Sequence, residues 1–279
     1  MLGKNIIVLA EQGVGDEIMF SGCIPDIMKH SPHKLFLECN ARLKPLFERS
    51  FPSIHIYEKS RAHDFSWINK HVDPDYYIPI GSLPKFFRNS VEQFPKRDSF
   101  LVPNLQLVEK WNQRLAELQD GLNIGISWQG GKEKKIIDIK STTLADWKPL
   151  LAMQANFINL QHGDTSKQIA EVCADENIQI HDWEDNDPLK DLDNQAALIS
   201  TLDLVISVSN ATIHLSGAVG TPTWVMLDTN QSWPMMRTFE HSTPLYQSVR
   251  LFRKHYQIAW HDVFMKVEAE LQKKINPER

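Results

Sequence analysis

The chain has little of what marks secreted, membrane-spanning or disulfide-stabilised proteins. Its 279 residues include only three cysteines, Cys23, Cys39 and Cys173. They are odd in number and far apart, which predicts neither a disulfide framework nor a zinc site and suits a reducing compartment. No apolar run approaches the roughly 20 residues needed to cross a bilayer, and no signal peptide precedes the first strand-like segment. We therefore expect a cytoplasmic protein without an integral membrane segment.

The chain also lacks an excess of positive charge. Its formal net charge is -5, which argues against a general surface for nucleic acid or anionic membranes but leaves room for a local basic pocket. Internal repeats and low-complexity segments are absent from the sequence. With 42% hydrophobic residues, the chain can bury the core of one large domain or of two moderate ones.

Apolar strand-like segments alternate with helix-like segments along the chain, which is typical of parallel sheets covered by helices. The predicted strands lie within 5–10, 34–39, 54–58, 75–80, 123–128, 157–161, 178–183, 203–208 and 223–227. A predicted amphipathic helix over 106–119 divides these strands into two series. The fold class that follows is α/β, with two Rossmann-like domains that face one another across a cleft.

Residues 203–227, DLVISVSNATIHLSGAVGTPTWVML, form the most informative segment. An apolar strand leads into a polar corner at which Asn210 is a good N-cap for a helix of small residues. The backbone NH groups of Ala211, Thr212 and Ile213 are then expected to point outward unpaired, at the positive end of the helix dipole. Such a helix start fits a diphosphate. The alternative is an ordinary strand-helix-strand unit with a capped helix and no ligand.

A second unit of the same kind opens the chain, where a strand precedes the loop EQGVGD and a predicted helix over 17–30. Gln12, Gly13 and Gly15 lie in this loop, and its glycines permit tight turns and the close approach of a ligand. The loop lacks the third glycine and the downstream acid of a dinucleotide fingerprint. Asp16 has two interpretations, as the N-cap of the helix or as a carboxylate that accepts a proton from a hydroxyl group.

An ordered series of motifs carries a family resemblance. The motifs are EQGVGDEIMF, LECNARLKPLFERSFP, IPIGSLP, IGISWQGG, INLQHGD, the stretch from DLDNQAALISTL to GTPTWVML, and YQSVRLF. They resemble the GT-B glycosyltransferase domain found behind tetratricopeptide repeats in bacteria, and they are similar to the heptosyltransferases of lipopolysaccharide synthesis, glycosyltransferase family 9. The resemblance covers nearly the whole chain, and the series is more specific than any one motif.

The resemblance implies a transferase of hexosyl or heptosyl groups with no obligatory metal and no cofactor besides a nucleotide-sugar donor, UDP- or ADP-linked. It implies an acceptor domain at 1–104, a linker helix at 105–121, a donor domain at 122–258 and a C-terminal helix at 259–279 that crosses back. The acceptor class is a glycan, a lipid-linked glycan such as lipopolysaccharide, or a protein, and nucleic acid is not expected. The alternatives are a sugar-nucleotide epimerase of similar fold and a noncatalytic relative that binds a nucleotide or a partner.

The resemblance also assigns roles to individual residues. Asp16 matches the aspartate proposed as the base that activates the acceptor. The residues that match the donor-phosphate helix are Asn210, Ala211, Thr212 and His214. This chain departs from the heptosyltransferases at Ser209-Asn210, where they tend to have Asp-Thr. His214 lies about one turn inside the helix, where a neutral imidazole can donate to the donor or can simply pack.

The loop after strand 123–128 supplies further candidates for the donor site. Lys132 and Lys140 can provide positive charge for a departing diphosphate, with Ser127 beside them, although a lysine-rich loop is also what a solvated surface contains. Lys140 with Ser141 matches the basic-Ser pair of the family and is preferred over the other lysines of the loop.

Three more donor-site candidates lie at strand ends, where nucleosides bind in related folds. Gln161 and Asp164 follow strand 157–161, and Trp128 ends strand 123–128. The alternatives are a turn or capping role for Asp164 and burial for Trp128. The acid pairs within 73–75 and 191–193 have the spacing of a metal-binding DxD, but their positions favour turn or capping roles.

Overall fold

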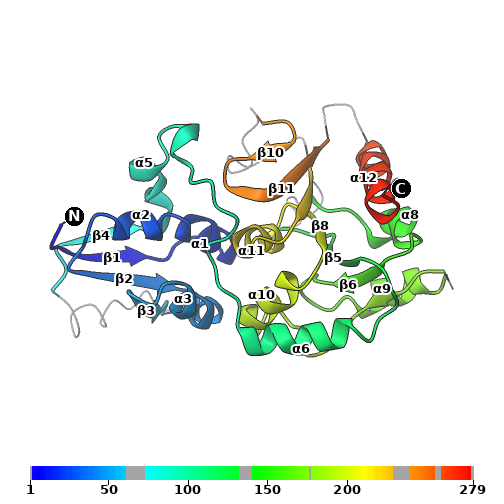
Figure 1. Cartoon of the computed structure of the whole chain (residues 1–279), viewed down its shortest axis with the longest axis horizontal. Coiled ribbons are helices and arrows are strands. Elements are labelled where there is room, and N and C mark those ends of the chain that lie inside the picture. Colours follow the sequence, from blue (N-terminus) through cyan, green and yellow to red (C-terminus); the bar gives the residue numbers. More distant parts are fainter. Residues whose placement is uncertain are drawn as a thin grey trace.

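The computed structural model describes residues 2–60, 73–131, 140–175, 177–228, 239–254 and 259–277. They form two sheets of mostly parallel strands with helices packed around them (Figure 1). The first sheet has the strand order β3-β2-β1-β4. Its strands are β1 (Asn5–Leu9), β2 (Lys34–Cys39), β3 (His55–Glu58) and β4 (Tyr76–Pro79), and every neighbouring pair is parallel.

The second sheet has the order β10-β11-β9-β8-β5-β6-β7 and is parallel except where β10 pairs with β11. Its strands are β5 (Asn123–Ser127), β6 (Asn156–Asn159), β7 (Ile180–His181), β8 (Leu204–Val208), β9 (Thr223–Leu227), β10 (Ser242–Thr243) and β11 (Tyr246–Arg253). Each strand predicted from the sequence is confirmed, while β10 and β11 are additions. The two sheets fall within the two predicted domains, whose boundaries stay predictions.

Short helices cover the first sheet. They are α1 (Val14–Ser21), α2 (Ile24–Met28), α3 (Lys44–Ser50) and α5 (Pro84–Phe87), with 3-10 turns at η1 (Ala41–Leu43), η2 (Ile80–Ser82) and η3 (Val91–Gln93). The prediction of one helix over 17–30 is wrong. Gly22 ends α1, and Pro25, which has no NH to donate, lies in the first turn of the separate helix α2.

The second half contains α6 (Leu105–Leu115), η4 (Leu144–Trp147), α8 (Lys148–Leu151), α9 (Ser166–Cys173), α10 (Leu192–Ser200), α11 (Ala211–Val219) and α12 (Trp260–Ile275). No helix among the described residues is long and apolar enough to cross a membrane.

The last helix, α12, packs against α8 and β11 of the second half (Figure 1). Phe264 meets Trp147 edge to face, and Arg250 of β11 pairs with Glu270 at 2.6 Å. The predicted crossing back to the first domain is therefore not what the structure shows. The apolar side of the helix, which includes the buried residues Val267 and Leu271, is covered by the core of the second sheet.

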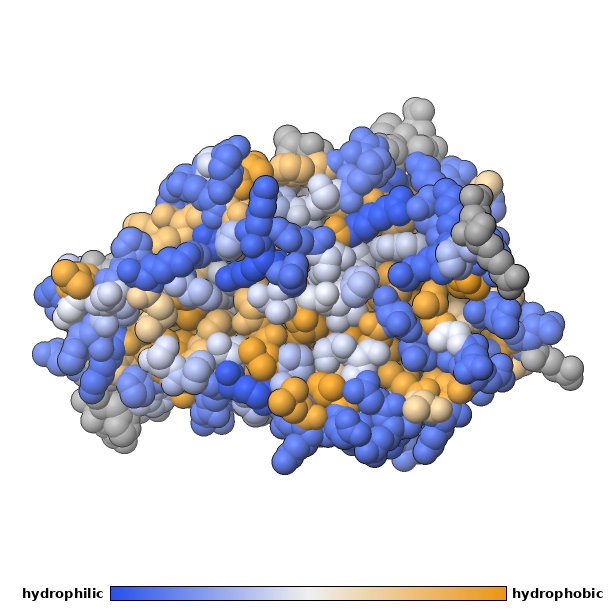
Figure 2. Space-filling view, viewed as in Figure 1, coloured by the Kyte–Doolittle hydropathy of each residue, from blue (hydrophilic) through white to orange (hydrophobic). Residues whose placement is uncertain are grey.

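One apolar cluster extends from the first sheet through α10 and α11 to the second sheet. Across this junction Arg49 of α3 forms an ion pair with Asp193 of α10, and within the second half the Trp111 indole of α6 donates to Asn194 of α10 at 3.1 Å. On the face seen in Figure 2, apolar and weakly polar residues run through the middle while hydrophilic residues surround them. Continuous packing thus joins the two halves and fixes the cleft between them.

Candidate functional site

Each sheet has a central strand at which the direction of the strand connections reverses. In the first sheet β1 lies between β2 and β4, and in the second sheet β5 lies between β6 and β8. Open α/β sheets bind ligands at such points, where neighbouring strands connect in opposite directions, beyond the carboxyl ends of the strands. The segments after β1, β5 and β8 contribute to the wall of one cavity of about 410 Å³ between the halves.

Most of the residues predicted from the sequence meet at this cavity. Those that line it are Gly13, Gly15, Asp16, Lys140, Ser209, Asn210, Ala211, Thr212 and His214. Those that do not line it are Gln12, Ser127, Trp128, Ser141, Gln161 and Asp164. Lys132 lies outside the described residues. The cavity therefore brings together the helix starts that follow β1 and β8, although they are nearly 200 residues apart in the chain.

The N-termini of α1 and α11 touch one another at the cavity. A Cβ atom added to Gly15 would lie 3.2 Å from His214 Cδ2 and 3.3 Å from Ala211 Cα. A side chain at Gly15 would therefore push the helices apart. Both helices present their positive ends to this space and so contribute positive potential to it, which Asp16 in the first turn of α1 partly offsets.

Asp16 is the third residue of α1, and the N-cap is Gly13, so the expectation that Asp16 itself occupies the N-cap is wrong. Its Oδ2 accepts a hydrogen bond from the Gly13 NH at 3.2 Å. Among the described residues, none donates a hydrogen bond to Oδ1. The carboxylate thus braces the loop with one oxygen and keeps the other available at the cavity. The loop is strained at Gln12, whose φ of 62 is left-handed.

Asn210 is the N-cap of α11, as predicted. Its Oδ1 accepts from the Thr212 NH at 2.9 Å, while its Nδ2 donates to Ser127 Oγ at 2.7 Å and to the Gln129 carbonyl at 3.0 Å. The expectation of an unpaired Thr212 NH is therefore wrong, because the cap already uses it. The same side chain ties the loop after β5 to the loop after β8 and so holds this wall of the cavity.

Ser127, Trp128 and Gln161 lie one layer behind the cavity. Gln161 Oε1 accepts from Ser127 Oγ, from the Trp128 NH and from the Gln129 NH at 2.8–3.0 Å. The Ser127 and Trp128 side chains are 0% exposed. These residues support the cavity wall from behind. Trp128 is buried, which was its alternative interpretation in the sequence.

The remaining candidates of the second half differ in position. Lys140 lines the cavity, and Ser141 Oγ accepts from the Gly130 NH at 3.0 Å just behind it. Asp164 is exposed and accepts from the Ser166 NH and Oγ at 3.1 and 2.6 Å. Asp164 therefore has the turn role that was one of its alternative interpretations, because the N-cap of α9 is Thr165.

His214, which is half-buried, pairs with the buried Tyr246 of β11. Its Nδ1 lies 3.0 Å from the phenol oxygen. Burial, together with the charge of Lys140, lowers the pKa of His214 to about 4, and burial raises the pKa of Tyr246. Both groups are therefore neutral near pH 7, so His214 lines the cavity as a neutral hydrogen-bonding group. Room for the phenol ring exists because a Cβ at Gly217 would lie 2.5 Å from it.

Sequence reasoning missed several wall residues that come from distant segments. Arg42 reaches the cavity from η1, and His162, Pro188 and Gln195 reach it from the second half. Tyr246 was present in a quoted motif but carried no assigned role. A lone arginine before a helix has no local signature, so only the packing of η1 against α10 reveals it.

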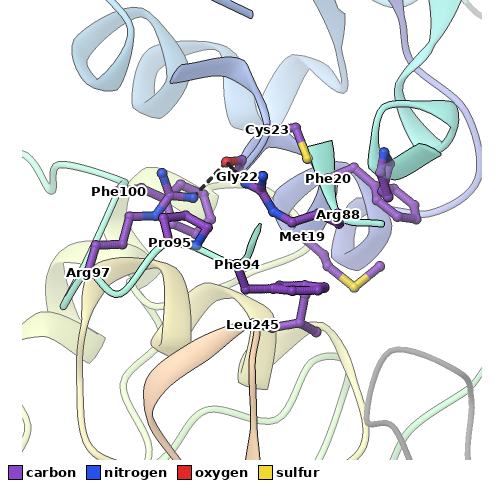
Figure 3. Close-up of a pocket in the computed structure, with 11 residues that line it drawn as sticks. Met19, Phe20, Gly22, Cys23, Arg88, Phe94, Pro95, Arg97, Phe100 and Leu245 are labelled. Atoms are coloured by element: carbon purple, nitrogen blue, oxygen red, sulfur yellow. Dashed lines mark hydrogen bonds between the residues drawn. The ribbon is translucent and has the colours of Figure 1, made fainter. Parts of the chain in front are cut away.

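A second cavity lies where the segment that follows α5 passes between the halves (Figure 3). Its space of about 30 Å³ holds roughly one water. Arg88 and Arg97 both donate to the Gly22 carbonyl at the C-terminal end of α1, at 3.2 and 2.7 Å. These cations complement the negative end of the helix dipole and fix the helix whose other end forms the main cavity.

No group of three or more metal-binding side chains occurs within the described part of the chain. In that part of the chain the second acid pair has the capping role favoured from the sequence, whereas Asp75 of the first pair contacts a distant segment instead of capping a helix or closing a turn. Asp75 pairs with Lys4 at 2.8 Å, and Asp191 caps α10 by accepting from the Asp193 and Asn194 NH groups.

Comparisons with known proteins agree with this architecture. No protein-family model matches the chain. It is 35% identical to the protein FlbA of Caulobacter vibrioides over 97% of its own length, and it spans 46% of that relative.

Among solved structures, the fold is similar to ADP-heptose LPS heptosyltransferase II of E. coli, with a TM-score of 0.70, 14% identity, and 98% and 99% of the two chains covered. It is also similar to a glycosyl transferase family 9 protein of Veillonella parvula, with a TM-score of 0.68, 14% identity, and 98% and 96% covered. At these identities the likeness concerns the fold. The chain therefore has the GT-B fold of the heptosyltransferases, as its motifs predict.

Proposed function

We propose that the chain is the catalytic domain of a metal-independent glycosyltransferase that moves a sugar from a nucleotide-sugar donor to a hydroxyl-bearing acceptor. The observation that carries this proposal is the single cavity in which two helix N-termini, Lys140 and the carboxylate of Asp16 meet. This combination places anion-binding groups and one candidate base around the same space. The E. coli neighbour is described as acting with ADP-heptose, which favours an ADP-linked donor here over a UDP-linked one.

The proposed sugar transfer gives a role to the cavity residues of each half. The acceptor oxygen bonds to the anomeric carbon of the sugar while the bond from that carbon to the phosphate oxygen breaks. Asp16 takes the proton of the acceptor hydroxyl. The negative charge that develops on the departing nucleoside diphosphate is stabilised by Lys140 and by the start of α11. His214, neutral near pH 7, is the hydrogen-bonding group between the two walls.

The first test is nucleotide binding. Because the proposed site recognises a diphosphate, ADP is expected to bind at least about tenfold more tightly than adenosine, with an affinity that falls as salt rises. Calorimetry with ADP and adenosine, followed by UDP, GDP and CDP, measures this difference. If none of the diphosphates binds at millimolar concentration, the donor site is not where we place it.

A second test concerns metals. Lysine and helix NH groups can stabilise a leaving diphosphate in place of a divalent cation. We therefore expect the release of nucleoside diphosphate from the donor to proceed at an unchanged rate after dialysis against EDTA. Loss of turnover on chelation, with recovery on adding Mn²⁺, would contradict a metal-independent mechanism.

A further inference from the structure

Arg42 connects the two halves at the cavity. Its backbone NH and its Nε donate to Asn40 Oδ1 at 3.1 and 3.2 Å, which orients the side chain at the start of η1. Its Nη1 crosses to the second half and donates to the Pro188 carbonyl at 2.9 Å. Both Arg42 and Pro188 line the cavity. An arginine of the first half is thus held in place beside the second half.

The charge of Arg42 is offset by carboxylates only at longer range: it acts to lower the pKa of Asp187 and opposes the rise that burial causes in the pKa of Glu17. The side chain is partly buried, yet no described acid lies within ion-pair distance of it. A partly buried cation that has hydrogen-bond partners but no ion-pair partner among the described residues is stabilised when an anion binds beside it in the cavity. The charge of Arg42 also acts on another residue that lines the cavity, His162. Burial and then the charge of Arg42 lower the pKa of this histidine.

The other groups of the cavity define which anion fits. Asp16 is the carboxylate of the wall, whereas Lys140 and the two helix N-termini contribute positive potential. The Nε and one hydrogen of Nη1 are engaged, which leaves Nη2 and the second hydrogen of Nη1 as adjacent donors. Two adjacent guanidinium donors match two oxygens of a phosphate group.

We propose that Arg42 binds a phosphate group of the nucleotide-sugar, so that the donor site includes a cation from the first half as well as the helix start of the second. The ligand then bridges the halves through the residue that already joins them. This inference rests on the proposed function, because it deepens the same site.

The test compares Arg42→Gln with Arg49→Gln. Arg49 is a matched control, since it also reaches from the first half to α10 through its ion pair with Asp193 but does not line the cavity. The measurement is calorimetry of each folded variant with ADP, inorganic pyrophosphate and adenosine, repeated at several salt concentrations. A melting curve verifies that each variant is folded at the temperature used.

We expect Arg42→Gln to weaken ADP binding by about 10- to 100-fold, the range for hydrogen bonds to charged groups, and to weaken pyrophosphate binding in parallel. Adenosine affinity stays the same, and the salt dependence of ADP binding becomes smaller. Arg42→Lys lies between wild type and Arg42→Gln, because a point charge cannot make the forked contact. Arg49→Gln lowers the melting temperature but leaves ADP affinity unchanged.

Equal ADP affinity in wild type and Arg42→Gln would overturn this inference while leaving the proposed function intact. A raised acceptor KM in that variant, with ADP affinity unchanged, would likewise overturn it and place Arg42 in the acceptor site. If wild type binds neither ADP nor any other nucleoside diphosphate, the proposed function itself fails.

Discussion

Replacing Asp16 by asparagine is expected to reduce sugar transfer by about 10²- to 10⁴-fold, the range for a positioned general base. An amide cannot take the proton of the acceptor hydroxyl. Its oxygen can still accept the Gly13 NH that Asp16 Oδ2 accepts at 3.2 Å, so the loop and α1 should fold as before. The loss of one charge in the first turn of a helix changes stability by less than about 1 kcal/mol.

The measurement is the release of nucleoside diphosphate in the presence of an acceptor, alongside a melting temperature and an ADP dissociation constant. Asp146→Asn is the matched control, because Asp146 is also the third residue of its helical turn and accepts the Thr143 NH at 2.8 Å, but it lies outside the cavity. Turnover retained in Asp16→Asn would reduce Asp16 to its bracing role. A large fall in ADP affinity would instead assign Asp16 to the donor.

Arg88→Met is expected to destabilise the protein by about 3 kcal/mol, the lower end for breaking a buried ion pair. Arg88 Nη2 lies 2.6 Å from Asp26 Oδ2, and the two side chains are 7% and 14% exposed. Methionine fills the space but leaves Asp26 with only the exposed Lys29 as an ion-pair partner among the described residues. The melting temperature should fall by roughly 6–12 °C.

The double variant Arg88→Met, Asp26→Asn isolates the pair. Removing the unpaired carboxylate should recover part of the lost stability, so the two changes are not additive. Although burial alone raises the pKa of Asp26, hydrogen bonds from Lys29 and Arg88 outweigh it and lower that pKa. The stabilisation is therefore present above pH 3.8 and disappears as the pH falls through the lower folded pKa. Additive effects at pH 7 would show that the pair contributes nothing.

The positions of the predicted strands followed from residue type. Segments such as 204–208 are apolar except for one serine, because both faces of a parallel sheet are covered. Gly22 and Pro25 also indicate the break between α1 and α2, although the helix predicted from the sequence runs through both. β11 escaped prediction because exposed and buried residues alternate irregularly along it.

The site was predicted at its helix starts and less well elsewhere. Asn210 and Gly15 have local signatures, a cap and a permissive turn, and both line the cavity. Whether Gln161 faces a ligand or supports the wall depends on its three hydrogen bonds from the strand and loop beside it. Those partners are more than 30 residues away in the chain, so no local pattern distinguishes the two roles.

The sequence by itself determined the α/β class, the succession of strands, and two polar corners suited to phosphate, because these depend on hydrophobic period and capping within a few residues. Only the tertiary structure decided that α12 stays with the second sheet, that Arg42 crosses to Pro188, and that α1 and α11 touch at Gly15. Each of these depends on which surfaces pack together. Packing depends on how the surfaces of segments far apart in the chain fit together, and the residues around any one position do not specify that fit.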